Sequence, residues 1–214
     1  MSLDSPLFPE LTPESLKHIA EHGTARTYPK NVVLIHEGDQ TDSFYVILKG
    51  KVKVYASDED GKEIILNIQG AGEYFGELAL IDAAPRSASV MTMEPCKLAV
   101  VSRADFEGFL TQHPRFAIEL IRSLVQRVRS LTESVKSLAL LDVYGRVART
   151  LLDLATEEEG ELAVRQRLTH QDIANMVGAS REMVSRIMKD LISGGYIRID
   201  DRRISIRNKL PPGW

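Results

Sequence analysis

The chain has 214 residues, which is long enough to bury a substantial core in one large or two modest domains. Hydrophobic residues make up 43% and charged residues 27% of the sequence, and these proportions exclude a largely disordered chain. The single cysteine, Cys96, excludes an internal disulfide and a four-cysteine iron–sulfur cluster, and it suits a reducing compartment. The first residues lack the pattern of a secretion signal, and no apolar run reaches membrane-spanning length. We therefore expect a cytoplasmic protein without a membrane partner.

Charge is distributed unevenly along the chain. From Arg165 to the C-terminus, ten Lys and Arg stand against five Asp and Glu, so this end carries +5 and the rest carries −8 of the overall −3. A basic end on an acidic body suggests that this end alone binds a polyanion. A surface that simply mixes charges explains the same count, and the count alone does not separate the two interpretations.

The N-terminal half begins with a short helix and continues as β-structure. Thr12 is the predicted N-cap, Pro13 takes the first helical position, and Gly23 follows the helix. Runs rich in β-branched and apolar residues come next, with glycines eleven or twelve residues apart: NVVLIHEGD, SFYVILKG, KVKVYASDEDG and KEIILNIQGAG. This spacing predicts short antiparallel strands folded into a roll or barrel, which continues to about Arg103.

The stretch YFGELALIDAAPRSASV has polar groups only near its two ends. Backbone N–H groups at Gly76, Glu77 and Leu78 near a helical turn would form an anion nest, and the glycine would let a ligand approach the backbone. Arg86 adds a positively charged fork and Ser87 a hydroxyl, so these groups together suit one phosphate. Glu77 could then accept from a sugar hydroxyl. The alternative is a Glu77–Arg86 salt bridge that only closes a surface loop.

From about Pro114 to Leu141 the pattern is helical. Apolar residues recur at spacings of three and four for nearly three heptads, and this stripe is narrower than that of a helix packed against its own domain. A parallel coiled coil between two copies explains the stripe better than the alternative, an intradomain helix. We define the seam by its residues: Ile121, Leu124, Val128, Leu131, Val135 and Leu138.

The C-terminal third predicts two helices separated by Gly178. Thr169 caps the first helix, Ser180 caps the second, and Ala174 is small enough for a close helix crossing. Both helices have an inward apolar stripe, which is the pattern of a helix-turn-helix. The segment GYIRIDDRRISIR then alternates like a β-hairpin, or wing, and the earlier ATEEEGEL is expected to be an acidic loop. The stripes comprise Ile173, Val177, Val184, Ile187 and Leu191.

The polar face of the second helix favours DNA binding over a merely packed helical pair. Arg181, Glu182, Ser185, Arg186 and Lys189 gather at its start and flank. An arginine fork reads guanine O6 and N7, and a glutamate accepts from cytosine N4. A solvated face would more often carry Lys and Glu four residues apart. Arg-Glu at the helix start therefore indicates base reading in a major groove.

Three motifs carry a family resemblance. FGELALIDAAPRSA resembles the phosphate-binding cassette of cyclic-nucleotide-binding domains, LALLDVYGR resembles a hinge after a dimer helix, and SREMVSR resembles a recognition helix. In this order they resemble the cAMP receptor protein/FNR family of bacterial transcription regulators over nearly the whole chain. The resemblance implies an α+β fold with a β-roll (jelly-roll) cyclic-nucleotide-binding domain over 1–113, a coiled-coil dimerisation helix over 114–141 and a winged helix-turn-helix over 142–214.

The resemblance also implies the ligands and the residues that meet them. It implies a homodimer that is controlled by cAMP as an effector and binds a palindromic operator with TGTGA-like half-sites in double-stranded DNA. Glu77 would accept from the ribose 2′-hydroxyl, while Arg86 and Ser87 would hold the cyclic phosphate. The other expected ligand contacts are Gly76, Leu78, Ala88, Arg127 and Thr132, the last two from the dimer helix. The expected base readers are Arg181, Glu182 and Arg186, and the expected DNA phosphate contacts are Thr169, Gln171, Ser180 and Lys189.

Two further positions are notable in the light of this resemblance. The cAMP-binding members carry a Thr-Ser pair on the dimer helix that contacts the adenine amino group, whereas this chain has Leu131-Thr132. We therefore expect looser discrimination between cAMP and cGMP. An acidic hairpin resembles a surface that contacts RNA polymerase in the family, although a solvated turn is the alternative; it contains Asp58, Glu59, Asp60 and Glu63.

Other functions find less support in the sequence. Haem-sensing relatives ligate iron through His or Cys, but of the five histidines only His18 and His22 are predicted to share a face. A cyclic-nucleotide hydrolase needs clustered metal-binding His and Asp, and no such cluster is visible. We therefore expect neither an enzyme nor a metal protein. The remaining alternative is a regulator of the same family that binds DNA without nucleotide or responds to another ligand, such as a cyclic dinucleotide.

Overall fold

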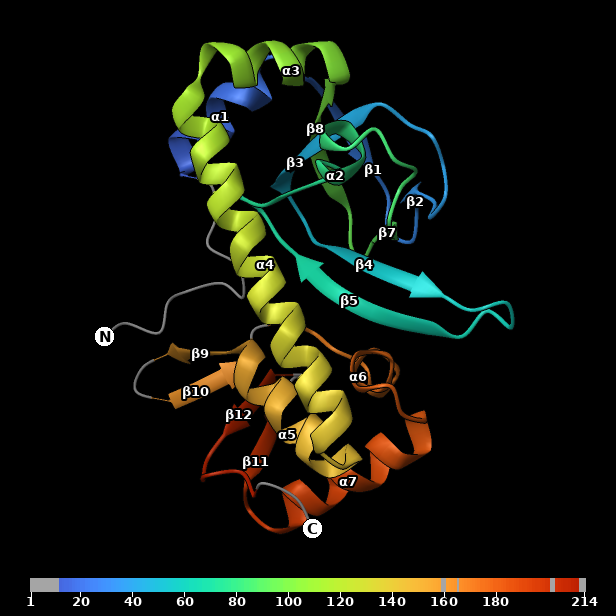
Figure 1. The fold of residues 1–214 in the computed structure, drawn as a ribbon. Coiled ribbons are helices and arrows are strands. Elements are labelled where there is room, and N and C mark those ends of the chain that lie inside the picture. Colours follow the sequence, from blue (N-terminus) through green and yellow to red (C-terminus); the bar gives the residue numbers. More distant parts are fainter. Residues whose placement is uncertain (1–11, 159–160, 165, 201–202, 212–214) are drawn as a thin grey trace. The chain divides into compact units, whose positions relative to one another are not determined.

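The computed structural model describes residues 12–158, 161–164, 166–200 and 203–211 (Figure 1). The chain divides into two compact units, one within Pro9–Val125 and the other within Gln126–Trp214. The long helix α4, Pro114–Leu140, contributes its first turns to the N-terminal unit and the remainder to the C-terminal unit. Among the helices that the structure describes, none is both long and apolar enough to cross a lipid bilayer.

The strands of the N-terminal unit form two four-stranded antiparallel sheets. The first has the order β1-β8-β3-β6 and the second the order β2-β7-β4-β5. Strands β4 and β5 form a long hairpin that Figure 1 shows extending away from the roll. The strands are β1 Thr24–Tyr28, β2 Val33–Ile35, β3 Ser43–Lys49, β4 Val52–Ser57, β5 Glu63–Gln69, β6 Tyr74–Phe75, β7 Ser89–Thr92 and β8 Cys96–Ser102.

Strand β3 separates two apolar cores, because alternate residues of a strand point to opposite faces. Tyr45 and Ile47 belong to a cluster inside the roll, with residues from both sheets. Phe44 and Val46 face a second cluster, which packs the first sheet against helices. Both faces of β3 are therefore covered, and this explains its nearly unbroken apolar run. The helices of this unit are α1 Pro13–Glu21, α2 Leu78–Ile81, α3 Arg103–Gln112 and the start of α4.

The C-terminal unit packs helices on a small antiparallel sheet of the order β11-β12-β10-β9. Its core includes Val147 and Leu151 from α5, Ile173 from α6, and Ile187 and Leu191 from α7, all buried. Its elements are α5 Val143–Leu154, β9 Ala155–Glu158, β10 Glu161–Val164, α6 His170–Val177, α7 Arg181–Ser193, β11 Ile197–Asp200 and β12 Arg203–Ile206.

The α+β fold class predicted from the sequence is confirmed, and one local prediction is wrong. The acidic stretch ATEEEGEL is not simply a loop, because its ends form β9 and β10. Glutamate is a poor strand former, but β10 pairs with both β9 and the wing strand β12, and Val164 is buried. The sequence patterns also did not predict β1 or α3. The tip of the predicted wing, at residues 201–202, lies outside the described residues.

Candidate functional site

The loop between β6 and β7 begins with a glycine in a conformation that other residues rarely adopt. Gly76 has a φ of +87°, and Glu77 is the N-cap of the one-turn helix α2. A Cβ at Gly76 would lie 2.8 Å from Arg86 Nη1 and 2.9 Å from the carbonyl oxygen of Ser43, so only glycine fits. A helix start leaves backbone N–H groups without intrahelical acceptors, so the N–H of Leu78 is a donor for a group in front of α2.

Arg86 contacts this glycine and is only 4% exposed. Its Nε donates to Thr41 Oγ1, its Nη1 to the carbonyl of Gly76 and its Nη2 to the carbonyl of Ser43, each at 2.7 Å. All three acceptors are neutral oxygens, so these bonds orient the guanidinium without neutralising it. A buried cation held in this way is suited to bind an anion.

Glu77 supplies the negative group of the same site and is only 1% exposed. Burial lowers the pKa of Arg86 from its ordinary value, and the nearby groups of Tyr45, Asp42 and Glu77 act in the opposite direction. Glu77 therefore interacts electrostatically with the guanidinium. A buried carboxylate beside a buried guanidinium suits a molecule that presents both a hydroxyl donor and an anionic group.

The other predicted ligand residues of the roll lie on the same loop. Leu78 and Ser87 are exposed, whereas Gly76 and Ala88 are half-buried. The loop brings these residues together with Glu77 and Arg86, which are nine positions apart in the sequence. Their contacts with a ligand stay a prediction.

Two sets of contacts hold this loop from outside, and the sequence did not reveal either. The N–H of Arg86 donates to the carbonyl of Asp39, and the N–H of Gly38 donates to the carbonyl of Arg86, both at 2.9 Å. The guanidinium of Arg103 donates to the carbonyls of Leu80 at 3.1 Å and Ala79 at 3.2 Å, at the end of α2. It also binds Asp42 Oδ1 at 3.1 Å, next to the Thr41 that holds Arg86. Arg103 therefore positions α2 relative to the β2–β3 loop.

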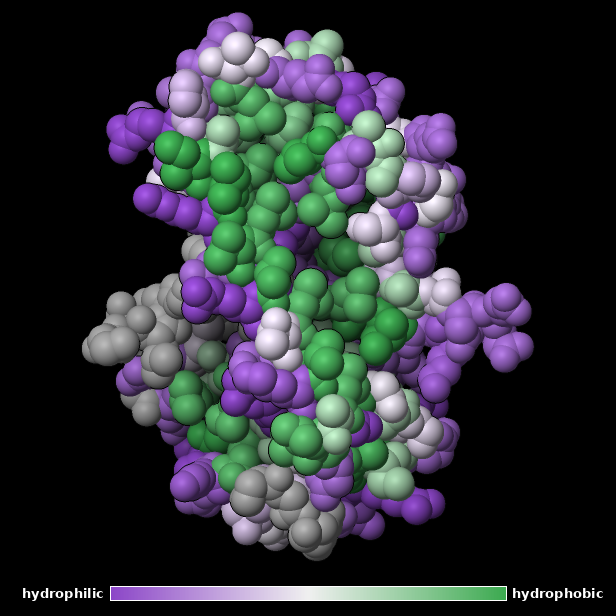
Figure 2. All heavy atoms as spheres, viewed as in Figure 1, coloured by the Kyte–Doolittle hydropathy of each residue, from purple (hydrophilic) through white to green (hydrophobic). Residues whose placement is uncertain are grey.

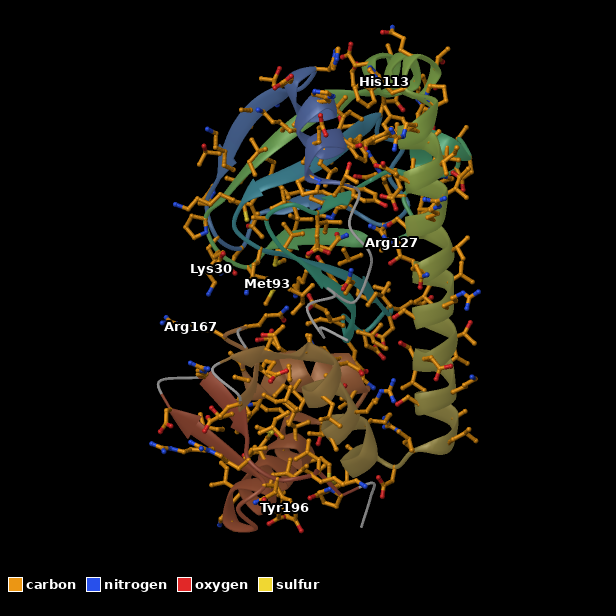
Figure 3. All side chains as sticks on the ribbon, turned by 90° about the vertical axis from the view of Figure 1, so that its left-hand side faces the viewer. Lys30, Met93, His113, Arg127, Arg167 and Tyr196 are labelled. Atoms are coloured by element: carbon orange, nitrogen blue, oxygen red, sulfur yellow. The ribbon has the colours of Figure 1, made fainter. Side chains whose placement is uncertain are left out.

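Helix α4 carries the remaining two predicted ligand residues and the seam. Arg127 (labelled in Figure 3) and Thr132 both lie in the half of α4 that belongs to the C-terminal unit, so their role at the nucleotide loop stays a prediction. Figure 2 shows hydrophobic side chains gathered along α4. Val128 is 63% and Val135 65% exposed, so the apolar seam has no cover within the described chain at these positions.

Helices α6 and α7 form the predicted helix-turn-helix. The Thr169 side chain accepts from the Asp172 N–H while Asp172 accepts from the Thr169 N–H, and this capping box starts α6. Gly178 ends α6 in the left-handed conformation, with a φ of +63°. Ser180 then caps α7 by accepting from the Met183 N–H. The caps, the turn and the inward apolar stripes therefore agree with the sequence predictions.

The predicted DNA-contacting side chains are all exposed, and the structure gathers them on two helix starts and one flank. The hydroxyls of Thr169 and Ser180 accept hydrogen bonds from the backbone as the N-caps of α6 and α7. In the predicted phosphate contacts, each hydroxyl would keep this capping bond and donate to a phosphate. The exposed residues are Thr169, Gln171, Ser180, Arg181, Glu182, Arg186 and Lys189.

Arg146 is a positioning residue. It is the last residue of the motif LALLDVYGR, and the sequence pattern did not predict its role. Its Nε donates to the carbonyl of Val177 at 2.8 Å, at the end of α6. Its Nη1 donates to the carbonyl of Leu141 at 3.0 Å, just after α4. One side chain on α5 therefore links the end of the long helix to the turn of the helix-turn-helix.

Histidines come together at one place that the sequence did not predict. The rings of His18 and His113 are 6.5 Å apart, and His113, labelled in Figure 3, packs on Phe109 at 4.2 Å. Within the described residues, no group of three His, Cys, Asp or Glu side chains is arranged to hold a metal ion.

Comparison with family models agrees with these two sites. Residues 25–113, which contain the Gly76–Arg86 loop, match the cyclic nucleotide-binding domain. Residues 145–209, which contain α6, α7 and the wing, match the Crp-like helix-turn-helix domain.

Known proteins resemble the chain over nearly its full length. The cAMP-activated global transcriptional regulator CRP of Pasteurella multocida is 37% identical, over 86% of this chain and 89% of that protein. The CRP-like cAMP-activated global transcriptional regulator of Mycobacterium tuberculosis is 32% identical, over 94% of this chain and 91% of that protein. The structure of the c-di-GMP-responsive global regulator CLP of Xanthomonas campestris matches with a TM-score of 0.77 and 28% identity, over 91% of this chain and 99% of that one. The chain therefore belongs to the Crp/Fnr family of DNA-binding transcription regulators, with a cyclic-nucleotide-binding roll and a Crp-like helix-turn-helix.

Proposed function

We propose that this regulator binds cAMP in the roll and responds by binding DNA more tightly. The observation that carries the proposal is the Arg86 guanidinium, buried and held by three neutral oxygens beside Gly76. A single buried cation suits a single phosphate, and Glu77 next to it suits the ribose 2′-hydroxyl. The names of the Pasteurella and Mycobacterium relatives as cAMP-activated regulators support cAMP as that ligand.

A cyclic dinucleotide is the second candidate ligand. The Xanthomonas regulator of similar fold is described as responsive to c-di-GMP. That ligand has two phosphates and would need a second cationic contact in addition to Arg86. Arg86 is the only buried arginine or lysine among the residues that the structure describes, and this favours a cyclic mononucleotide.

We propose that two copies associate in parallel through the seam on α4. Exposed apolar side chains along one stripe of a long helix, such as Val128 and Val135, are what a two-stranded coiled coil would bury. In the dimer, Arg127 and Thr132 would reach the bound nucleotide. Two-fold symmetry would then place the two α7 helices on half-sites of a palindromic operator, one helical turn apart.

On the DNA, Arg181, Glu182 and Arg186 would read bases of a TGTGA-like half-site, and Thr169, Gln171, Ser180 and Lys189 would contact phosphates. The acidic hairpin between β4 and β5 would contact RNA polymerase. The protein would act in the cytoplasm, and it would not be an enzyme. The sensor would occupy residues 1–113, the dimer helix 114–141 and the DNA-binding domain 142–214.

Calorimetry with a panel of cyclic nucleotides tests the ligand. We expect cAMP to bind with one site per chain, more tightly than c-di-GMP, and Arg86→Ala to abolish this binding. Fluorescence anisotropy with a palindromic operator should then give tighter binding with cAMP than without it. Operator binding that is indifferent to every nucleotide would instead identify a nucleotide-independent regulator, and preference for c-di-GMP would identify the second candidate.

A further inference from the structure

A buried hydrogen bond joins the nucleotide loop to the long helix. The hydroxyl of Tyr74 on β6 donates to Ser123 Oγ on α4 over 2.6 Å. Both residues are only 2% exposed, so water does not compete for this bond. They are 49 positions apart in the sequence. A buried polar pair in an otherwise apolar contact specifies one arrangement of the two elements, because apolar packing alone is not directional.

The surroundings of Tyr74 keep it in place from several directions. Its ring packs on Phe44 at a centroid distance of 5.5 Å, in the cluster that also contains Phe116 and Leu120 of α4. Its backbone carbonyl accepts from Gln69 Nε2 at 2.7 Å. Gln69 is itself 1% exposed, so β5, β6 and α4 are joined by a short series of buried polar contacts.

The Tyr74–Ser123 bond joins a residue next to the nucleotide loop to a residue near the end of the N-terminal unit. Tyr74 is two residues before Gly76, whose carbonyl accepts from the Arg86 guanidinium. Ser123 is two residues before Val125, where the N-terminal unit ends within α4. Displacement of the Gly76 backbone by a ligand would therefore move Tyr74, and through its hydroxyl it would move the last turn of α4 in this unit.

We propose that Tyr74 and Ser123 are positioning residues that couple nucleotide occupancy of the roll to the setting of α4. The proposal rests on the proposed function, because it assumes a nucleotide at Arg86 and an operator-binding response. A ligand shifts an equilibrium only through its different affinity for two states. The Tyr74–Ser123 bond would supply such a difference by forming in one setting of α4 and not in the other, because it joins the strand next to the ligand to the helix that carries the seam.

The test compares hydroxyl deletions that keep the surrounding packing. Tyr74→Phe retains the ring in its apolar cluster, and Ser123→Ala removes only the acceptor oxygen. Tyr55→Phe is the matched control, because Tyr55 is also a buried tyrosine of the roll but lies on β4, whereas the hydroxyl that Ser123 accepts from is that of Tyr74. The measured quantity is the coupling ratio, defined as the operator Kd without cAMP divided by the operator Kd with saturating cAMP.

We expect Tyr74→Phe and Ser123→Ala each to lower the coupling ratio by about two- to tenfold, the range of one neutral hydrogen bond. The double variant should lower it no further than either single variant, because both remove the same bond. Tyr55→Phe should keep the wild-type ratio. By thermodynamic linkage, the ratio of the cAMP affinity of the operator-bound protein to that of the free protein should fall by the same factor.

A merely structural bond would change the melting temperature but leave the coupling ratio at its wild-type value, and that result would overturn the proposal. Additive losses in the double variant would also overturn it, since the two residues would then act separately. If the wild-type protein bound no cyclic nucleotide, the proposed function itself would fail. A nucleotide-responsive wild type with unchanged ratios in Tyr74→Phe and Ser123→Ala would contradict only the coupling role.

Discussion

Gly76 and Arg86 constrain each other. The carbonyl of Gly76 accepts from Arg86 Nη1 at 2.7 Å, and a Cβ at Gly76 would lie 2.8 Å from that same nitrogen. The glycine therefore makes room for the guanidinium, and the guanidinium fixes the glycine backbone. This contact links the backbone of the loop directly to the guanidinium.

Gly76→Ala should reduce nucleotide affinity. The substitution combines a φ of +87°, which costs about 1–2 kcal/mol, with displacement of Arg86, so we expect a loss of at least about fivefold in calorimetry. Gly72→Ala is the matched control, because Gly72 has the same φ of +87° but open space around it. Equal losses in the two variants would show that backbone strain, and not the Arg86 contact, governs affinity.

Arg86→Ala should abolish cAMP binding in the accessible concentration range. Removing one partner of a buried ion pair costs about 3–5 kcal/mol, which is roughly a few-hundred- to few-thousandfold in Kd. Glu77→Ala should cost less, because its partner is a neutral hydroxyl. Arg103→Ala, which removes contacts to α2 and to Asp42 but leaves Arg86 in place, serves as the comparison and should weaken binding least. Normal cAMP binding by Arg86→Ala would contradict the assigned site.

Base readers and phosphate contacts on the helix-turn-helix should separate in a competition assay. Arg181→Ala, Glu182→Ala and Arg186→Ala should each cost about 1–3 kcal/mol and relax preference at one base pair. Lys189→Ala should instead weaken all sequences alike and reduce the salt dependence of binding. Thr169→Ala is less suitable as a test, because it also removes the cap of α6. Unchanged operator selectivity in Glu182→Ala would count against the trio.

Arg146→Ala should weaken operator binding while leaving nucleotide affinity unchanged. The variant loses the two hydrogen bonds from Arg146 to the carbonyls of Leu141 and Val177. At about 0.5–1.5 kcal/mol each, their loss predicts about a five- to 150-fold loss in operator affinity. Arg149→Ala is the control from the same helix, because Arg149 is exposed and forms its ion pair with Asp153 of α5 itself. A comparable loss in both variants would indicate a general charge effect on DNA binding.

Leu131→Thr should lower operator binding before nucleotide is added and increase the response to cAMP. Leu131 is 51% exposed on the seam, where leucine favours a two-stranded parallel coil and so a larger unliganded active population. Threonine would also restore an adenine contact worth about 0.5–1.5 kcal/mol. Ser134→Ala, off the seam on the same helix, is the control. Fluorescence anisotropy on one operator measures both effects, and equal basal binding and response in wild type and Leu131→Thr would show that this seam residue does not set the switch.

Features that depend on nearby residues could be predicted from the sequence. The caps at Thr12, Thr169 and Ser180 and the left-handed Gly178 involve groups within a few positions of one another, so their patterns are visible in the printed chain. The heptad spacing of α4 is likewise local, and it predicted the helix. The Gly-Glu and Arg-Ser groups of the nucleotide loop were recognisable because their residue types and spacing are restricted by phosphate chemistry.

Features that depend on distant residues were decided only by the tertiary structure. Arg86 takes its acceptors from Thr41 and Ser43, more than forty positions away, and Tyr74 finds Ser123 at a separation of 49. Glu157, Glu158 and Glu161 lie in strands because β10 pairs with β9 on one side and with β12 on the other, and this pairing overrides their low local preference. The type of a residue shows which kind of partner it requires, such as a hydrogen-bond acceptor or a neighbouring strand. Which distant group meets that need follows from how the sheets and helices pack, and that depends on the whole chain at once.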